Sequence, residues 1–266
     1  MKAVIFYYSS TGNTRLACQF LARQLKNVEF ELIDITQGKD AAAASGYDVV
    51  GFATPTFHLG VPPLMANFIQ QLLPQSNKPA FVINTYGALP GRTLKILAKL
   101  ATNRGFNIIA GHSLLTPENY PPFILKGWVN EDAPNDEEME KFEQFIAELS
   151  DRLTAIRSGQ AVVPAKIKIG FFNTLMRPAA VAKAKKKMGP LLLDELTCTA
   201  CGTCADGCPY GAITLNSKPV FDTARCHGCW TCFNHCPEQA IYTAKIRGQG
   251  HYPQPLPKFV AKMEAH

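Results

Sequence analysis

Short apolar runs alternate with amphipathic stretches over the first 160 residues of the chain. Runs rich in Val, Ile, Phe and Ala predict five strands, at residues 3–8, 28–33, 48–53, 80–84 and 107–113. Apolar residues at three- and four-residue intervals predict helices at residues 14–26, 64–72, 92–103 and 136–157. This alternation predicts an α/β fold, in which a doubly wound, five-stranded parallel sheet has helices on both faces.

In such a sheet, ligands bind outside the carboxyl ends of the strands, at the point where the strand order reverses. The irregular segment at residues 116–130, which contains three prolines, is expected to lie over that crevice as a loop. Within it, Glu118, Asn119 and Tyr120 are candidates for the lining of a substrate pocket. The fold therefore directs attention to the loops that follow the first, third and fourth strands.

Basic residues are concentrated in the second half of the chain. The 266 residues carry a net charge of +6, but residues 1–150 hold 12 Lys and Arg against 14 Asp and Glu, whereas residues 151–266 hold 15 against 7. No nucleic-acid-binding motif accompanies this charge, so nucleic acid is not an expected partner. No apolar run is long enough for a transmembrane segment or a signal-peptide core, which makes the cytoplasm the expected location.

A basic connector at residues 161–190 follows the sheet domain, which is assigned to residues 1–160. The connector holds seven Lys or Arg and no Asp or Glu. Its apolar side chains are expected to pack between two domains, although a helix lying on a membrane surface would have the same composition. These side chains are Ile167, Phe171, Phe172, Leu175 and Met176. The proline-rich tail at residues 246–266 is expected to form an extended strap or a loose end.

The cysteines are the most specific feature of the sequence. Cys18 stands alone on a predicted helix, where a small buried or half-buried packing residue is expected rather than a functional thiol. The other eight form two runs with the spacing C-x2-C-x2-C-x3-C-P, and each cysteine of the second run lies 28 residues after its counterpart in the first. The runs are Cys198, Cys201, Cys204 and Cys208, then Cys226, Cys229, Cys232 and Cys236. Without a secretion signal, such crowding favours metal ligation over disulfides.

This spacing predicts two 4Fe-4S clusters with crossed ligation, because three closely spaced thiolates wrap one cluster and the fourth, beyond the Pro turn, reaches the other. Cluster 1 is assigned to Cys198, Cys201, Cys204 and Cys236, and cluster 2 to Cys226, Cys229, Cys232 and Cys208. Four-cysteine zinc sites are the alternative, although paired C-x2-C motifs would then be expected. Residues 191–245 resemble the bacterial two-cluster ferredoxin, a module that moves single electrons between protein partners.

Other residues among the ligands are interpreted as supporting ones. Tyr210 and Trp230 are expected to shield the clusters rather than to relay electrons, and His227 and His235 are expected to be surface or supporting residues, since the thiolate count is already full.

A turn rich in serine and threonine follows the first predicted strand and opens directly into a helix. It consists of Ser9, Ser10, Thr11, Gly12, Asn13 and Thr14. Its hydroxyls and the free amides of the helix start can hold a phosphate, and Gly12 permits a close approach. Taken alone, the turn is equally compatible with a simple helix cap.

Two further loops meet this turn at the same edge of the predicted sheet and can enclose a flat ring with it. They contain Thr54, Pro55, Thr56, Phe57, His58, Leu59 and Gly60 after the third strand, and Asn84, Thr85, Tyr86, Gly87 and Gly91 after the fourth. With these loops, residues 1–157 resemble flavodoxin, and the resemblance implies FMN, its phosphate in the first loop and its isoalloxazine ring between the other two. Unlike those of short electron-carrying flavodoxins, these ring loops contain no Asp, Glu or Trp, so Phe57 or Tyr86 is expected to stack on the ring.

Over nearly its whole length, the chain resembles the flavodoxin-ferredoxin fusion proteins. The resemblance implies an electron-transfer flavoprotein that passes electrons between two 4Fe-4S clusters and FMN. Three roles remain open: a soluble carrier or adapter between a redox donor and a redox acceptor, a reductase of a quinone-like small molecule at the flavin, and a subunit or sensor that reports redox state. No G-x-G-x-x-G turn follows a predicted strand, so a built-in nicotinamide site is not expected.

Overall fold

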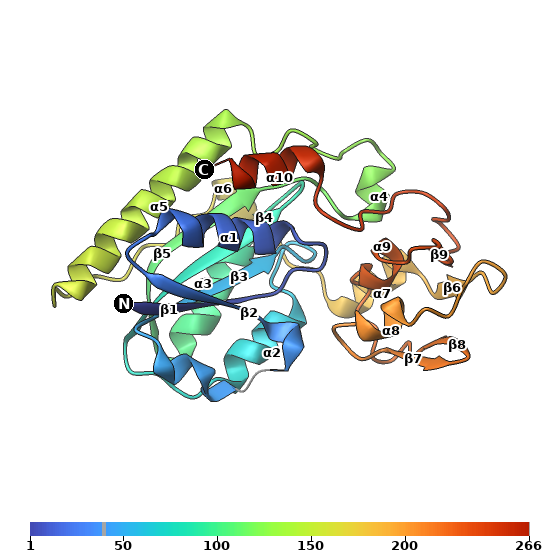
Figure 1. The fold of residues 1–266 in the computed structure, drawn as a ribbon, viewed down its shortest axis with the longest axis horizontal. Coiled ribbons are helices and arrows are strands. Elements are labelled where there is room, and N and C mark those ends of the chain that lie inside the picture. Colours follow the sequence, from blue (N-terminus) through green and yellow to red (C-terminus); the bar gives the residue numbers. More distant parts are fainter. Residues whose placement is uncertain (39–40, 266) are drawn as a thin grey trace.

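A five-stranded parallel sheet organises the N-terminal part of the protein (Figure 1). The computed structural model describes residues 1–38 and 41–265. The strands are β1 (Lys2–Tyr7), β2 (Glu29–Asp34), β3 (Val49–Pro55), β4 (Lys78–Tyr86) and β5 (Phe106–Leu115), in the order β2-β1-β3-β4-β5. The sheet predicted from the sequence is confirmed, and every strand end lies within two residues of its predicted position.

Helices cover both faces of this sheet, and successive residues of a strand face different sides. Ala3, Ile5 and Tyr7 of β1 belong to one apolar core, whereas Val4 and Phe6 belong to the other. The first core is completed by α1 (Asn13–Gln24) and α5 (Asp136–Arg157), and the second by α2 (Pro63–Gln71) and α3 (Thr93–Asn103). Two short 3-10 helices, η1 (Ile35–Gln37) and η2 (Ala41–Gly46), lead from β2 towards β3.

The parallel register aligns the carboxyl ends of β1, β3 and β4. Tyr7 pairs with Ala53, and Thr54 pairs with Asn84. The loops after these strands therefore leave the sheet at one edge, as the sequence predicts. The loop between β5 and α5 contains the short helix α4 (Pro121–Ile124), which Figure 1 shows on the side of the cysteine-rich module.

The connector first runs along the outer edge of β5. The amide of Ala165 donates a hydrogen bond to the carbonyl of Ile108 (2.7 Å), and the side chain of Asn107 donates one to the carbonyl of Val162 (3.1 Å). This segment covers an edge strand that could otherwise pair with another chain. Two helices follow, α6 (Phe171–Leu175) and α7 (Val181–Met188).

The expectation that the connector's apolar side chains pack between two domains is wrong for three of them. Phe171, Phe172 and Leu175 are 72%, 76% and 66% exposed. Ile167 packs against the second core, and after α6 the amide of Ala179 donates a hydrogen bond to the His58 carbonyl (3.0 Å), so the connector contacts the sheet domain on both sides of α6. Met188, at the end of α7, is buried against apolar residues of the cysteine-rich module.

Two antiparallel strand pairs and two short helices form the module that carries eight cysteines. β6 (Leu191–Leu193) pairs with β9 (Ile241–Thr243), and β7 (Ile213–Asn216) pairs with β8 (Lys218–Phe221). The helices α8 (Thr203–Asp206) and α9 (Thr231–Asn234) each lie within one cysteine run. Their first residues are displaced by the same interval as the cysteines, so the sequence repeat is also a structural repeat.

The tail after β9 returns to the sheet domain and ends in α10 (Pro257–Glu264), beside α1 (Figure 1). Phe259 and Met263 are fully buried in the first core, and the guanidinium of Arg23 donates a hydrogen bond to the Met263 carbonyl. The tail is therefore a strap. Its helix was not expected from the prolines, but Pro257 occupies the start of the helix, where its missing amide is harmless.

We expect Phe259→Ala to lower the free energy of unfolding by about 3 kcal/mol, because it removes a fully buried ring from the first core. Urea unfolding followed by circular dichroism measures this loss. Lys258→Ala is the matched control, since its ion pair with Asp132 (2.8 Å) is solvent-exposed and contributes little. Equal stability of Phe259→Ala and the parent protein would mean that α10 does not dock on α1.

Candidate cofactor sites

A cavity of about 800 Å³ lies between the carboxyl edge of the sheet and the cysteine-rich module. Its walls come from the loops after β1, β3, β4 and β5, from the connector and from the module. The predicted cofactor-binding residues that line it are Ser9, Ser10, Thr11, Asn13, Thr14, Pro55, Thr56, Phe57, His58, Leu59, Thr85, Tyr86 and Gly87. The structure thus brings all three predicted loops to one cavity.

Five other predicted residues, Gly12, Thr54, Gly60, Asn84 and Gly91, are not among those that line this cavity. Asn84 is fully buried behind the wall. Its side-chain amide donates a hydrogen bond to the Thr56 hydroxyl (3.0 Å), and its side-chain oxygen accepts one from the Ser113 hydroxyl (2.6 Å). The role of Asn84 in the structure is therefore to hold the loop after β3 against β4 and β5.

Ser9 shapes the turn after β1. Its hydroxyl accepts hydrogen bonds from the amides of Gly12 (3.1 Å) and Arg15 (3.2 Å). Gly12 has a φ of 101°, a left-handed conformation that favours glycine, and a β-carbon there would lie 2.7 Å from Pro255 of the tail. The turn leads into α1, whose first amides have no partner within the helix and can donate to an anion.

The loop after β3 folds back on itself beside the cavity. Phe57 and Gly60 exchange two backbone hydrogen bonds (2.8 and 3.0 Å), and His58 and Leu59 between them adopt positive φ angles of 46° and 70°. Burial, and then the charge of Lys187, lower the pKa of His58 below its usual value. This shift favours the neutral form of the imidazole.

Glu118 supplies the carboxylate that the two ring loops lack. It lines the cavity and is only 7% exposed. One of its oxygens accepts hydrogen bonds from the amides of Asn119 and Tyr120 (both 2.9 Å). Burial raises the pKa of Glu118, and these two amides partly oppose the increase. A β-carbon at Gly87 would lie 2.6 Å from Glu118, so the loop after β4 needs glycine at this position.

Cations from the second half of the chain complete the cavity. Arg177, Lys183 and Lys187 of the connector line it, as does Lys245 of the module. The sequence analysis identified the connector as basic but did not place it at the cofactor loops. The uninterrupted positive charge of the connector was the only signal in the sequence that pointed to an anion-binding role. The position of the connector at the cavity depends on how the module folds back onto the sheet domain.

Two smaller cavities lie within the cysteine-rich module, and each is lined by four cysteines. Cys198, Cys201, Cys204 and Cys236 line one of them. Cys208, Cys226, Cys229 and Cys232 line the other. Each set combines three cysteines of one run with the fourth of the other run, which is the arrangement that a cubane held from several sides requires. In the part of the chain that the structure describes, no three His, Cys, Asp or Glu side chains are grouped so that they could hold a single metal ion.

Backbone amides approach the cysteine sulfurs in the same pattern in both halves of the module. The Ala212 amide donates to Cys208 Sγ (3.3 Å), and the Ala240 amide donates to Cys236 Sγ (3.2 Å). A second pair of such bonds, at 3.4 Å, joins Ala200 to Cys198 and Gly228 to Cys226. Hydrogen bonds to cluster sulfurs stabilise negative charge and so tune reduction potential.

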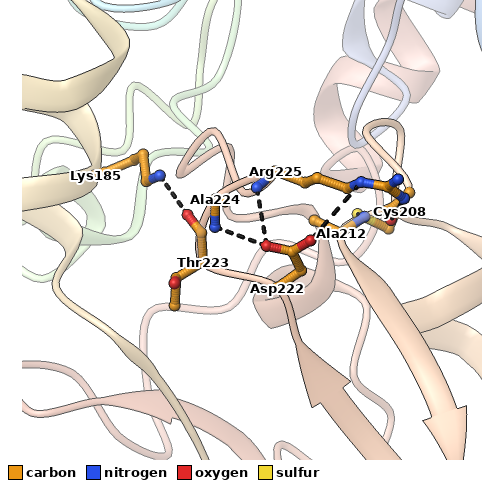
Figure 2. Close-up of polar contacts among 8 residues, drawn as sticks. Lys185, Cys208, Ala212, Asp222, Thr223, Ala224 and Arg225 are labelled. Atoms are coloured by element: carbon orange, nitrogen blue, oxygen red, sulfur yellow. Dashed lines mark hydrogen bonds and ion pairs between the residues drawn. The ribbon is translucent and has the colours of Figure 1, made fainter.

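An aspartate turn precedes each cysteine run. Figure 2 shows the turn at Asp222, whose side chain accepts hydrogen bonds from the amides of Ala224 (2.7 Å) and Arg225 (3.2 Å), while Lys185 of α7 donates to the Thr223 carbonyl. The Cys226 amide in turn donates to the Asp222 carbonyl (3.0 Å). The turn therefore fixes the start of the second run and ties the connector helix to it.

The second cysteine set is the one beside the large cavity. Cys229 and its neighbour Trp230 line both the smaller cavity and the large one. Tyr8 and Tyr210 also line the large cavity, and their buried hydroxyls have no hydrogen bond of ordinary geometry among residues 1–38 and 41–265, although the Tyr8 hydroxyl lies beside the side chains of Ser10 and Thr231. The cavity wall therefore offers two polar atoms that a bound group can satisfy.

Hydrogen bonds seat α9 on the sheet domain. The hydroxyls of Ser10 and Thr231 lie 2.8 Å apart, and His235 Nε2 lies 2.7 Å from the Ser10 carbonyl oxygen. The Asn234 side chain donates to the carbonyl of Asn119 (3.2 Å). His235, interpreted from the sequence as a surface or supporting residue, is thus a contact between the two parts of the protein.

The tail strengthens the same junction. The amide of Tyr252 donates to the side-chain oxygen of Asn234 (3.2 Å), and its hydroxyl donates to that of Asn13 (3.0 Å). One residue of the tail thereby joins α9 to the first turn of α1. The sequence analysis missed Tyr252, because nothing in a proline-rich tail marks a tyrosine as an interdomain contact.

Two further expectations concern single residues and membranes. Cys18 is fully buried in the first core, as predicted, and burial raises the pKa of its thiol. Across the described residues, the helices are too short or too polar for any of them to span a bilayer.

Comparisons with known proteins agree with this division of the chain. The family model of the flavodoxin domain matches residues 4–95, and that of the 4Fe-4S dicluster domain matches residues 197–241. No curated protein matches the chain.

Among solved structures, the protein is similar to oxidised flavodoxin 1 of Bacillus cereus, with 22% identity and a TM-score of 0.45 over 57% of this chain and 98% of that one. It is also similar to the rubredoxin oxygen:oxidoreductase of Desulfovibrio gigas, with 22% identity and a TM-score of 0.46 over 58% of this chain and 36% of that one.

The two family models identify domains that occur in electron-transfer proteins, one associated with FMN and the other with iron-sulfur clusters. The chain therefore contains a flavodoxin domain followed by a 4Fe-4S dicluster domain, consistent with a flavodoxin-ferredoxin fusion protein.

Proposed function

We propose that this protein passes electrons between two 4Fe-4S clusters and FMN, and that it acts as a carrier or adapter between a redox donor and a redox acceptor. The observation that carries the proposal is the shared wall at Cys229, where the cavity bounded by the three flavodoxin loops meets a four-cysteine cavity. FMN can exchange electrons singly or in pairs, whereas a cluster exchanges one at a time. Joining the two on one chain gives each a high effective concentration of the other.

The proposed cluster ligands are the two crossed sets. Cluster 1 is held by Cys198, Cys201, Cys204 and Cys236, and cluster 2 by Cys226, Cys229, Cys232 and Cys208. Cluster 2 is the near cluster, because Cys229 borders the large cavity. Cluster 1 is the far cluster, and its ligand Cys201 is exposed to solvent, where an external redox protein can approach.

The proposed FMN site is the large cavity. Its volume, about 800 Å³, lies within the range of small-molecule and cofactor sites. The turn at residues 9–14 would hold the phosphate, and the loops at residues 54–60 and 84–91 would hold the ring. The orphaned hydroxyls of Tyr8 and Tyr210 support a bound polar group in this space.

Reduction of a small molecule at the flavin is the second candidate function. Glu118 supports it, because this carboxyl borders the cavity and its burial raises its pKa, which favours the protonated form that can act as a proton donor. Arg177 and Lys183 can attract an anionic acceptor, or donate hydrogen bonds to the carbonyl oxygens of a quinone-like one. The two roles differ in whether the protein turns over such an acceptor faster than free reduced flavin does.

The proposal also assigns boundaries and a location. The flavodoxin-like domain spans residues 1–160, the connector 161–190, the cluster module 191–245 and the tail 246–266. We assign the protein to the cytoplasm, where its eight clustered cysteines would remain reduced and available for clusters.

The crossed ligation can be tested with a matched pair of variants, Cys208→Ser and Cys236→Ser. Each change should reduce the iron content of anaerobically prepared protein from about eight atoms to about four. In Cys208→Ser, alkylation followed by mass spectrometry should find Cys226, Cys229 and Cys232 reactive while the other run stays protected. Cys236→Ser should give the converse pattern. If the cysteines of the substituted run became reactive instead, the crossed ligation would be wrong. Stoichiometric zinc without acid-labile sulfide would show that the cysteines do not bind 4Fe-4S clusters.

The flavin site can be tested with Ser9→Ala. This change removes the hydroxyl that accepts from two amides of the phosphate turn, so we expect the FMN dissociation constant to rise by about tenfold while the iron content stays constant. Fluorescence titration of flavin-free protein with FMN measures the affinity. Ser158→Ala, at the far end of α5, is the control. Unchanged affinity in Ser9→Ala would place the phosphate elsewhere.

Electron transfer from the clusters to the flavin within one molecule can be tested by rapid mixing with a reductant that donates electrons to the clusters. The contacts of α9 and Tyr252 hold the module on the flavodoxin domain, so flavin reduction should proceed at a rate independent of protein concentration. Cys208→Ser, which removes the near cluster, should abolish the fast phase, whereas Cys236→Ser should retain it. A rate proportional to protein concentration would show that electrons pass between molecules.

A further inference from the structure

One threonine contacts both proposed cofactor sites. Thr231 Oγ1 lies 3.3 Å from Cys229 Sγ, a proposed ligand of the near cluster, and 2.8 Å from the hydroxyl of Ser10 in the phosphate turn. Thr231 is 6% exposed, so water does not compete freely for either contact. Ser10 itself lines the flavin cavity. A chain of two hydroxyls therefore joins the phosphate turn to a cluster sulfur.

The junction around this chain is fixed by other bonds. His235 Nε2 contacts the carbonyl of Ser10 (2.7 Å), and Asn234 donates to the carbonyl of Asn119 (3.2 Å). Asn119 in turn donates to the hydroxyl of Thr11 in the phosphate turn (2.7 Å). Because α9 is held at both ends, the Ser10 and Thr231 hydroxyls respond to a new bonding partner by reorienting their protons rather than by moving apart.

The structural repeat provides an internal comparison. Thr203 occupies the equivalent position in the first half of the module, and its hydroxyl also lies 3.3 Å from a cysteine sulfur, that of Cys201. Both of these residues are exposed, and neither lines the flavin cavity. The same threonine-to-sulfur bond therefore occurs once beside the flavin site and once beside solvent.

The number of protons that the Ser10 and Thr231 hydroxyls can donate explains why this buried pair matters. Each hydroxyl donates one hydrogen bond, whereas a thiolate and a phosphate can only accept. Without phosphate, Ser10 can donate to Thr231 and Thr231 to Cys229, and such consecutive bonds strengthen one another. When Ser10 instead donates to a phosphate, Thr231 loses the donor that polarised it. Its bond to the Cys229 sulfur then weakens.

We propose that Thr231 is a positioning residue that couples the two cofactors, so that FMN phosphate bound at Ser10 lowers the reduction potential of the near cluster. This inference rests on the proposed function. A hydrogen bond to a cluster sulfur stabilises the more negative, reduced state, and weakening that bond makes the cluster a stronger reductant. The near cluster thus donates electrons most readily when its acceptor is in place.

Coupling between two sites is reciprocal. If bound FMN lowers the potential of the near cluster, reduction of that cluster must weaken FMN binding by the corresponding factor. The negative charge of the phosphate also acts on the cluster through space, with the same sign. Only the part transmitted by the hydroxyl chain depends on Thr231, and a substitution at that residue separates the two contributions.

The experiment uses full-length protein with both clusters, in the flavin-free and FMN-bound forms. EPR-monitored redox titration measures the cluster potentials in both forms, and fluorescence titration measures the FMN dissociation constant with the clusters oxidised. Because reduced clusters would also reduce FMN, the dissociation constant for the reduced protein is obtained from the shift in potential by linkage. In the parent protein, FMN should lower the near-cluster potential, and reduction should raise the dissociation constant by about fivefold or more. In Thr231→Val, the near-cluster potential should already be lower without FMN, and both coupling effects should fall to the part that the phosphate charge exerts through space.

Two control variants sharpen the result. Thr203→Val removes the equivalent bond at Cys201, so it should lower the far-cluster potential and leave the FMN-dependent shift of the near cluster unchanged. Ser10→Ala keeps the Thr231 bond to sulfur but disconnects it from the phosphate turn, so it should reduce the coupling to the same through-space part. An FMN-dependent shift of equal size in the parent protein and Thr231→Val would overturn the inference while leaving the proposed function intact. Failure of the cluster-loaded parent protein to bind FMN would overturn both.

Discussion

The contact on which the rest of this arrangement depends is the seating of α9 on the loop after β1. That loop is where the parallel sheet presents its free amides and hydroxyls. α9 carries Cys232, and Cys229 lies just before the helix, two residues from the Thr231 side chain that contacts Ser10. Tyr120 packs against Trp230 at this junction, and the polar bonds beside that contact specify orientation, because each needs a partner at a defined distance and angle. A purely apolar interface would permit sliding that these bonds resist. The relative placement of the two proposed cofactors follows from this seating.

The chain reinforces the junction by crossing between its two parts twice. The connector leaves along β5 and enters the module through α7, and the tail returns from β9 to place α10 beside α1 (Figure 1). Two connections restrict the module more strongly than one linker would, since separation of the parts requires release of α10 from the first core as well as loss of the α9 contacts. Pro255, packed against Gly12, lies on the returning segment, so the tail also bears directly on the phosphate turn.

The parts of this structure that could be predicted from the sequence are those governed by local pattern. The sheet followed from apolar runs, the edge of the sheet that holds the cofactor loops followed from the topology rule, and the two cysteine runs followed from spacing. Contacts between distant segments gave no such signal. The role of Tyr252 depends on the path of a tail whose prolines indicate only an extended chain, and the exposure of Phe171 and Phe172 could not be separated from packing by composition alone. Glu118 was identified as a candidate for a pocket lining, but its burial required the loop after β4 to be in place.

The position of α10 links the order of synthesis to the completion of the protein. α10 follows the cluster module in the chain, so the ribosome makes the flavodoxin domain, then the cysteines, and only afterwards the helix that covers α1 and contributes Phe259 and Met263 to the first core. Until then, the outer face of α1 exposes apolar surface and Pro255 is not yet packed on Gly12. A nascent or truncated chain that lacks the module therefore also lacks a finished flavodoxin core. Quality control that removes poorly packed chains would then also remove flavodoxin domains made without their electron-transfer partner.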